Sequence, residues 1–193
     1  MIFKGEIMIN ELVKKNRSYR RFHADRLTVA ELRSFVESAR LSGSAANRQR
    51  LRFALVTERE MTDRVFECLR FAAFLTEWSG PAENERPAAY IVMMCKGELD
   101  TNLAIDAGIA AQSILLTATE QGIGGCMFRS YDSPRLTAIL DRAEGYAPCL
   151  VIALGRPSER VLITEPKDGD LKYYRDADDN HVVPKLSLDE III

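Results

Sequence analysis

One long apolar segment, residues 103–121, constrains the fold of this chain more than any other feature. Its composition predicts the longest helix of the protein, with isoleucine, leucine and alanine on nearly all sides and few charges. A helix that is apolar all round has to be covered all round by other parts of a protein. In a chain of 193 residues, a second subunit is one way to supply that cover.

The other periodic segments are short, and helices and strands are mixed along the chain. We expect helices at residues 9–13, 28–40, 61–75 and 133–140, strands at residues 53–56, 88–95 and 149–154, and a further strand entered through the glycine-rich residues 122–128. Thr28 and Glu31 form a capping box at the second helix, and Ser133 and Pro134 fit the N-cap and first position of the last. Because the strands lie far apart in sequence, we expect a layered α+β or α/β fold with helices covering a central sheet.

The charge balance argues against a nucleic-acid partner. The formal net charge is −2, whereas nucleic-acid binding usually shows as a basic surplus or stripe. No apolar run approaches the ~18 residues that a membrane span requires, and residues 1–11 lack the apolar core and cleavage site of a signal peptide. We therefore expect a cytoplasmic protein with no nucleic-acid or membrane partner, whose first seven residues form a loose extension.

The cysteines and histidines do not predict a metal site. Cys68, Cys95, Cys126 and Cys149 are widely separated, and no pair has the CxxC spacing of a zinc or redox site. The two histidines do not complete a zinc pattern either. We expect no metal, and we interpret the cysteines as small apolar residues in a reducing compartment.

The first cluster of functional interest is Arg17-Ser18-Tyr19-Arg20-Arg21, in a polar break after the first helix. Guanidinium groups beside a hydroxyl can hold a phosphate through charge-assisted, bidentate hydrogen bonds. Taken alone, the cluster fits a solvated basic turn better, because charge runs are usually surface.

Two further clusters have the composition of ligand-binding loops. Residues 42–49 combine small residues, which permit close approach of a flat ligand, with an asparagine and a glutamine that supply donors and acceptors. Residues 124–130 begin with two glycines, which let the backbone come near a ligand. The alternatives are an ordinary interhelix loop and a helix C-cap followed by a strand. The glycines do not form a dinucleotide fingerprint, because GxGxxG is absent and they follow a helix.

The order and spacing of the three clusters resemble the nitroreductase family of FMN enzymes. An Arg-Ser-x-Arg-x-Phe element occupies residues 17–22, and a Ser-Ala-x-Asn-x-Gln element occupies residues 44–49. The long central helix, the glycine-rich turn, a strand at residues 151–157 and a tail at residues 173–185 follow in the family's order. The resemblance covers residues 9–190. Each motif is weak by itself, and their combination is specific.

The resemblance implies an α+β fold with a central, mostly antiparallel sheet flanked by helices, in an intertwined homodimer. It implies one domain, residues 1–193, whose residues 157–193 form a C-terminal extension that docks on the partner subunit. The long helix would pack in the dimer core, and the flavin would lie at the interface between the subunits.

The resemblance also assigns cofactor-binding residues. They are Arg17, Ser18 and Arg20 at the phosphate and pyrimidine edge, Ser44, Ala45, Asn47 and Gln49 reaching the flavin from the other subunit, Gly125, Met127, Phe128 and Arg129 with their backbone along the ring, and Lys185 returning from the tail to the phosphate. No residue is implied as a catalytic acid, base or nucleophile, because the chemistry takes place on the flavin. Cys126 is interpreted as packing, since no clear activating neighbour is apparent.

The implied activity is an FMN-dependent oxidoreductase with a ping-pong mechanism. NADH or NADPH would deliver hydride to the flavin, and a nitroaromatic, a quinone or a similar acceptor would then take the electrons. Positive charge near the flavin would stabilise its reduced, anionic form.

Some positions depart from the family pattern. Asn16 and Leu186 stand where an arginine is common, Gly43 precedes Ser44 in place of another small residue or proline, and Arg50-Leu51 replaces a frequent Pro-Trp or Pro-Leu. The two missing positive charges weaken the case for strong phosphate binding. Arg48 and Arg50 would compensate if they face the site.

Three other interpretations of the sequence remain open. One is a flavin enzyme of the same fold with another reaction, such as reductive dehalogenation or flavin fragmentation, although the short segment at residues 76–86 leaves little room for a lid. Another is a flavin-binding or redox-sensing protein with little turnover, which the missing arginines support weakly. The third is an interaction module that docks through its isoleucine-rich end and binds no flavin.

Overall fold

The structure is a computed structural model that describes residues 8–72, 74–75, 77–140 and 145–193. The loose extension expected for the first seven residues lies outside the described residues. A four-stranded sheet forms the centre, with β1 (Arg52–Val56), β2 (Ala89–Lys96), β4 (Tyr146–Gly155) and β3 (Gly124–Phe128) side by side in that order. All three pairings are antiparallel, which confirms the expected sheet.

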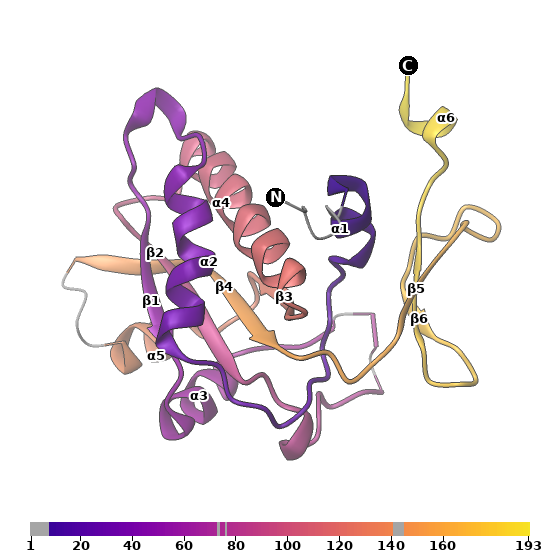
Figure 1. Ribbon diagram of the computed structural model, residues 1–193, viewed down its shortest axis with the longest axis horizontal. Coiled ribbons are helices and arrows are strands. Elements are labelled where there is room, and N and C mark those ends of the chain that lie inside the picture. The colour runs from indigo at the N-terminus through magenta and orange to yellow at the C-terminus, as the bar shows by residue number, and fades with distance from the viewer. Residues whose placement is uncertain (1–7, 73, 76, 141–144) are drawn as a thin grey trace, which may run out of the picture.

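Helices cover both faces of this sheet because its strands are apolar on both sides. Alternate residues of a strand point to opposite faces, so Ile91 and Met93 of β2 join one core cluster while Tyr90 and Val92 join another. The first cluster lies beneath α2 (Val29–Leu41) and α4 (Thr101–Glu120), which run side by side across the sheet (Figure 1). The second lies beneath α3 (Arg59–Phe66) and α5 (Ser133–Ile139).

Among the described residues, those that pack on the long helix α4 cover only one of its sides. Leu103, Ala111 and Ile114 are fully buried against α2 and the sheet. On the other side Ile105 and Ile109 are 56% and 41% exposed. The described part of the chain therefore leaves one side of this helix exposed, and its cover by a second subunit stays a prediction.

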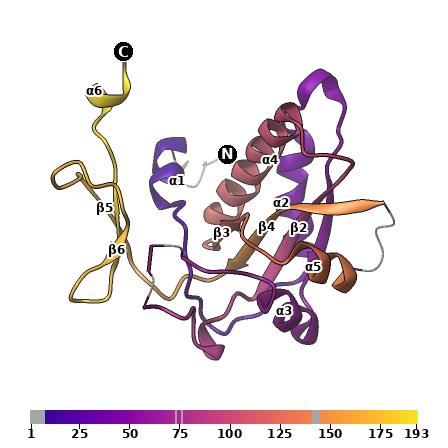
Figure 2. The ribbon, with the colours of Figure 1, turned by 180° about the vertical axis from the view of Figure 1, so that it is seen from behind.

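The end of the chain forms a small sheet of its own, which the sequence did not predict. β5 (Val161–Thr164) pairs in parallel with β7 (His181–Pro184), and β6 (Tyr174–Arg175) pairs antiparallel with β7 on its other side. The short helix α6 (Leu188–Ile191) follows. Figures 1 and 2 show this extension standing away from the central sheet, with α1 (Ile9–Lys15) seen between it and α4.

Two helix boundaries differ from expectation. The helix expected at residues 61–75 ends at Phe66, because the chain turns away to form a bridge between Leu69 and Tyr131. The N-cap of α5 is Asp132, whose carboxylate accepts the Arg135 amide at 3.1 Å. The prediction of Ser133 as the N-cap is therefore wrong, because Ser133 is the first helical residue. The capping box of Thr28 on α2 is confirmed.

Two short 3₁₀ helices complete the described elements, η1 at Ala45–Asn47 and η2 at Glu83–Glu85. Among the described helices, none combines the length and the apolar character that crossing a membrane requires. All four cysteines are buried as free thiols.

Candidate functional site

The arginine segment lies directly beside the glycine-rich strand. After α1 ends, Ser18 forms a parallel bridge with Gly125, and the Tyr19 amide donates to the Gly125 carbonyl at 3.1 Å. A Cβ atom added at Gly124 would lie 2.4 Å from the Tyr19 ring. The glycines therefore allow two segments of this chain to approach closely, and they bring the first and third sequence clusters together.

A buried carboxylate from the extension fixes the course of this segment. The Glu159 side chain is 3% exposed. Its Oε1 accepts the backbone amides of Arg20 and of Arg21, the latter at 3.0 Å, and its Oε2 accepts Nη2 of Arg175 at 2.6 Å. One acidic side chain thereby orders the backbone of the segment and balances part of its positive charge.

The Arg20 side chain is sandwiched by residues of the extension. Arg20 is 8% exposed, and its Nη1 lies 2.9 Å from Nε2 of His181 and 3.2 Å from the Ser18 carbonyl. Its guanidinium carbon lies 4.8 Å from the centre of the Tyr173 ring, a cation–π distance. Burial, and then the positive charge of Arg20, lower the pKa of His181 to about 4.

Unpaired hydrogen-bond donors concentrate in this cluster. Seven buried side-chain polar atoms have no hydrogen-bond partner among the described residues, and five of them belong here: Nε of Arg17, Arg20, Arg21 and Arg175, and Nδ1 of His181. Buried polar groups are ordinarily paired, and each exception needs an explanation. Arg21 forms ion pairs with Glu85 and Asp179, and Arg175 forms ion pairs with Glu159 and Asp179, so their charges are largely balanced. Arg17 and Arg20 form no ion pair with a carboxylate among the described residues, and an anion with several acceptor oxygens fits this remaining positive charge. At the rim, Ser18 is exposed and Arg17 is half-buried.

The second sequence cluster is built around another buried carboxylate, that of Asp106 on α4. Asp106 is 5% exposed and accepts the Ser44 hydroxyl and the Ala45 amide, each at 2.9 Å. The Ser44 hydroxyl oxygen in turn accepts the Gln49 amide at 3.0 Å. This closes a tight loop in which Asn47 and Gln49 have left-handed backbones, with φ of 53° and 47°. Both side chains are exposed.

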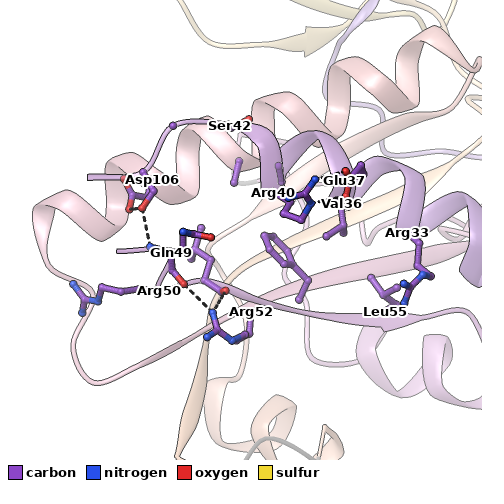
Figure 3. Close-up of a pocket in the computed structure, with 16 residues that line it drawn as sticks. Arg33, Val36, Glu37, Arg40, Ser42, Gln49, Arg50, Arg52, Leu55 and Asp106 are labelled. Carbon is purple, nitrogen blue, oxygen red and sulfur yellow. Dashed lines mark hydrogen bonds and ion pairs between the residues drawn. The ribbon is translucent and has the colours of Figure 1, made fainter. Parts of the chain in front are cut away.

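A pocket of about 420 Å³ lies beside this loop, between α2 and the edge strand β1 (Figure 3). Its floor is apolar, with Val36, Phe53 and Leu55, and arginines stand at its rim. Figure 3 shows Asp106 at one end of the pocket and Arg33 at the other.

Within one chain, the Ser44 loop and the arginine segment are far apart. Asp106 lies near the start of α4, whereas β3 begins at Gly124 just after this helix ends. At 1.5 Å per residue, the helix from Asp106 to its end at Glu120 spans about 21 Å. The structure therefore brings two of the three sequence clusters together and leaves the third at the opposite end of α4.

The remaining predicted residues take different positions. Phe128 is 5% exposed and packs its ring against Phe71 at 4.7 Å, so only its backbone is available to a ligand. Met127 is 38% exposed, and Arg129 is exposed. Lys185 is exposed and lies four residues after His181, which in extended backbone is about 13 Å. Its expected role at the phosphate stays a prediction.

The arginines that could replace the missing charges are placed elsewhere. Arg50 pairs with Asp100, the N-cap residue of α4, and Arg48 is exposed in the Ser44 loop. Asn16, at a position where the resemblance expects an arginine, is 9% exposed and ends α1 through its amide. Burial raises the pKa of the Cys126 thiol, in keeping with its interpretation as a packing residue.

Sequence reasoning did not identify Glu159, Arg175 or His181 as site residues. The tail around Arg175 and His181 was noted only for its likeness to one branch of the family. The signal that could have found them is the adjacent pair Tyr173 and Tyr174 among the charged residues that follow the last strand of the central sheet, because a tail that docks needs side chains to bury.

The fold and site together define an α+β protein with a cationic cluster beside a glycine-containing edge strand. The model of the Nitroreductase family matches residues 13–156, and the chain belongs to this family. Membership makes it an oxidoreductase by class.

Solved structures share the fold over nearly the whole chain. A nitroreductase family protein from Streptococcus pneumoniae TIGR4 has a TM-score of 0.69 at 20% identity, covering 96% of this chain and 99% of that one. An FMN-dependent nitroreductase from Clostridium difficile R20291 has a TM-score of 0.65 at 22% identity, covering 94% and 96%. A nitroreductase family protein from Clostridium novyi NT has a TM-score of 0.65 at 17% identity, covering 96% and 100%.

Proposed function

We propose that this protein is an FMN-dependent oxidoreductase that uses NADH or NADPH to reduce nitroaromatics, quinones or similar acceptors. The observation that supports the proposal is the cluster of buried side-chain nitrogens without a hydrogen-bond partner on Arg17, Arg20, Arg21, Arg175 and His181. Of these residues, Arg17 and Arg20 are the arginines that also lack an ion pair with a carboxylate among the described residues. The phosphate of FMN supplies the oxygens that such donors need. One solved relative of this fold is itself described as FMN-dependent.

The proposal places the flavin between two copies of the chain. The arginine segment and β3 form one wall, and Asn47 and Gln49 cannot reach that wall from the same chain because α4 separates them. A second copy that covers the exposed side of α4, including Ile105 and Ile109, would bring its own Ser44 loop to the site. The exposed apolar residues Ile191, Ile192 and Ile193 would dock on the partner.

FMN, when bound, supplies the hydride chemistry of the reaction. The chain's own residues then have three tasks. Arg17, Ser18 and Arg20 would hold the phosphate and the pyrimidine edge of the ring, and the β3 backbone from Gly125 to Arg129 would position the ring. The positive charge of the segment would stabilise negative charge on the reduced cofactor. No side chain is needed to move a proton at a substrate carbon.

A flavin-binding or redox-sensing protein with little turnover is the second candidate. The observation that favours it is the engagement of Arg50 with Asp100, which leaves the missing positive charges uncompensated within this chain.

The test starts from the absorption spectrum of the purified, untagged protein. Flavin maxima, with about one FMN per chain released on denaturation, support the proposal. NADH or NADPH oxidation that depends on an added quinone separates the enzyme from the sensor. The variant Arg20→Met should lose FMN, whereas Arg33→Met, at an exposed position of α2, should retain it. A colourless protein that also fails to take up added FMN would contradict the proposal.

A further inference from the structure

The Ser44 loop, residues 44–49, has an unusual backbone for an exposed loop. Ala46, Asn47 and Gln49 all have left-handed backbones, with φ of 51°, 53° and 47°. Residues other than glycine rarely adopt this conformation, and they keep it only where the surrounding structure holds it. The Gln49 side-chain amide donates to the Asn47 side-chain oxygen at 3.0 Å. The loop therefore presents two exposed polar side chains in one fixed arrangement, on a strained backbone.

The group that holds this backbone is the carboxylate of Asp106, in the second turn of α4. Its Oδ1 accepts the Ala45 amide and its Oδ2 accepts the Ser44 hydroxyl, each at 2.9 Å. The oxygen of the same hydroxyl accepts the Gln49 amide at 3.0 Å. One carboxylate thereby fixes the start of the loop directly and its end through Ser44.

Asp106 depends on the loop as much as the loop depends on Asp106. The residue is 5% exposed, and a buried carboxylate is costly unless hydrogen bonds compensate for the lost water. Among the described residues no cation forms an ion pair with it, because the nearby Arg50 pairs with Asp100 instead. The compensating donors are those of the loop, so removing either partner leaves the other unsatisfied.

The helix that carries Asp106 is the one that the proposed function places against a second copy. Ile105 and Ile109, on the turns around Asp106, are 56% and 41% exposed. Ser42, just before the loop, also contacts this helix, with its hydroxyl 2.7 Å from that of Ser113. A loop tied to α4 in this way keeps a fixed position relative to whatever covers the exposed side of α4.

We propose that Asp106 is a positioning residue, which holds Asn47 and Gln49 in the arrangement that contacts the flavin of the second copy. This inference rests on the proposed function. Asp106 is too buried to touch a cofactor, so it acts through the loop. The flavin affinity of one copy then depends on a carboxylate inside the long helix of the other.

The experiment is a double-mutant cycle in FMN affinity, measured by fluorescence titration. Asp106→Ala removes both acceptor oxygens, and Asp106→Asn keeps one of them. Asp106→Ala should weaken FMN binding by about tenfold or more, the scale of a lost hydrogen bond to a charged group, and Asp106→Asn should recover part of that loss. If Asp106 acts through the loop, the loss in Asp106→Ala/Gln49→Ala should be at least about threefold smaller than the product of the two single losses.

Glu60→Gln is the matched control, because it removes one carboxylate charge from an exposed position of α3. It should leave FMN affinity unchanged. Thermal unfolding shows which variants are folded, and Asp106→Asn replaces Asp106→Ala in the cycle if the latter does not fold. Single losses that simply multiply in the double variant would overturn the inference, as would a folded Asp106→Ala protein with native affinity.

A measurement without flavin separates this inference from the proposed function. Arg48 is exposed within the loop, and trypsin cleaves after arginine where the backbone can open locally. In full-length protein without added flavin, Asp106→Asn should be cut after Arg48 about tenfold faster than the native protein, and Glu60→Gln at the native rate. Equal rates for all three would overturn the inference even if FMN binds. A native protein that binds no FMN would instead contradict the proposed function, whatever the digestion shows.

Discussion

The arginine segment and the Ser44 loop are both predicted to contact one flavin, and they are built alike in one respect. Each is organised by a buried carboxylate that accepts main-chain amides, Glu159 for the arginine segment and Asp106 for the loop. They differ in which of their hydrogen-bonding groups lack a partner. The arginine segment has buried donors without partners, whereas the Asn47 and Gln49 side chains of the loop point to solvent and bond to each other at 3.0 Å.

This difference distinguishes the part of the predicted flavin site that one chain forms from the part that requires a second chain. The arginine segment is held in place by the extension of the same chain, through Glu159 and His181. The Ser44 loop is exposed and lies about 21 Å away along α4, so we predict that it contacts the flavin of a neighbouring copy. The predictions below test the two regions against each other.

The largest effect is expected at the carboxylate of the arginine segment. Glu159→Leu leaves Arg175 and the amides of Arg20 and Arg21 without their acceptor in a buried site. Removing one partner of a buried ion pair costs about 3–5 kcal/mol of stability. Urea unfolding at pH 7 measures this directly. A loss below about 1 kcal/mol would show that water replaces the carboxylate.

The pH dependence of stability should single out His181. Its pKa of about 4 in the folded protein lies below the usual value of about 6.5. Between these values the unfolded chain binds a proton that the folded chain does not, so stability falls as the pH drops through this window. At pH 5 the loss from this group is about 2 kcal/mol relative to pH 7.5.

His181→Gln provides the control for that titration, because glutamine does not titrate. Urea unfolding of both proteins at pH 7.5 and pH 5 should give a smaller decrease for the variant. Equal decreases would contradict the buried, neutral histidine.

A pair of glycine substitutions compares the packing of the two regions. In Gly124→Ala, the new methyl group would lie 2.4 Å from the Tyr19 ring and 2.6 Å from Pro157, and overpacking of this kind costs about 1–3 kcal/mol. In Gly43→Ala, beside the Ser44 loop, nothing lies within 4 Å of the new methyl group. We expect a thermal midpoint that falls for the first variant and stays unchanged for the second. The reverse order would refute the close approach of the arginine segment to β3.

The smallest effect on stability is expected at the tip of the Ser44 loop. Gln49→Ala removes an exposed side chain, and surface substitutions of this kind change stability by less than about 0.5 kcal/mol. The same variant should weaken FMN binding by about three- to tenfold if Gln49 donates to the flavin of the partner. Fluorescence titration with FMN, beside urea unfolding, separates the two effects. Native affinity would remove Gln49 from the site.

Much of the central fold could be read from the sequence because its signals are local. The capping box at Thr28 and the apolar run of β2 each specify an element by themselves. The end of α3 could not be read, since it depends on the bridge between Leu69 and Tyr131, two residues far apart in sequence. The small sheet of the extension was missed because its strands are short and charged, and their pairing is non-local.

The site was predictable only in part for the same reason. Arg17, Ser18 and Arg20 stand in a contiguous motif, and the bridge to Gly125 joins two such motifs. Glu159 and His181 lie far along the chain from Arg20, and they contact it only when the extension folds back. Asp106 lies within the long apolar helix, and nothing in the sequence of that helix shows that its carboxylate binds Ser44 and Ala45.

The central claim is that each flavin takes Arg20 from one chain and Asn47 and Gln49 from the other. Heterodimers formed from an Arg20→Met chain and an Asn47→Ala/Gln49→Ala chain, isolated through two different tags, test it directly. Such a heterodimer contains one site with both substitutions and one native site. The account predicts that it binds about half of the FMN bound by the native dimer, while each variant homodimer binds little. A heterodimer that binds no more FMN than the variant homodimers would contradict the claim.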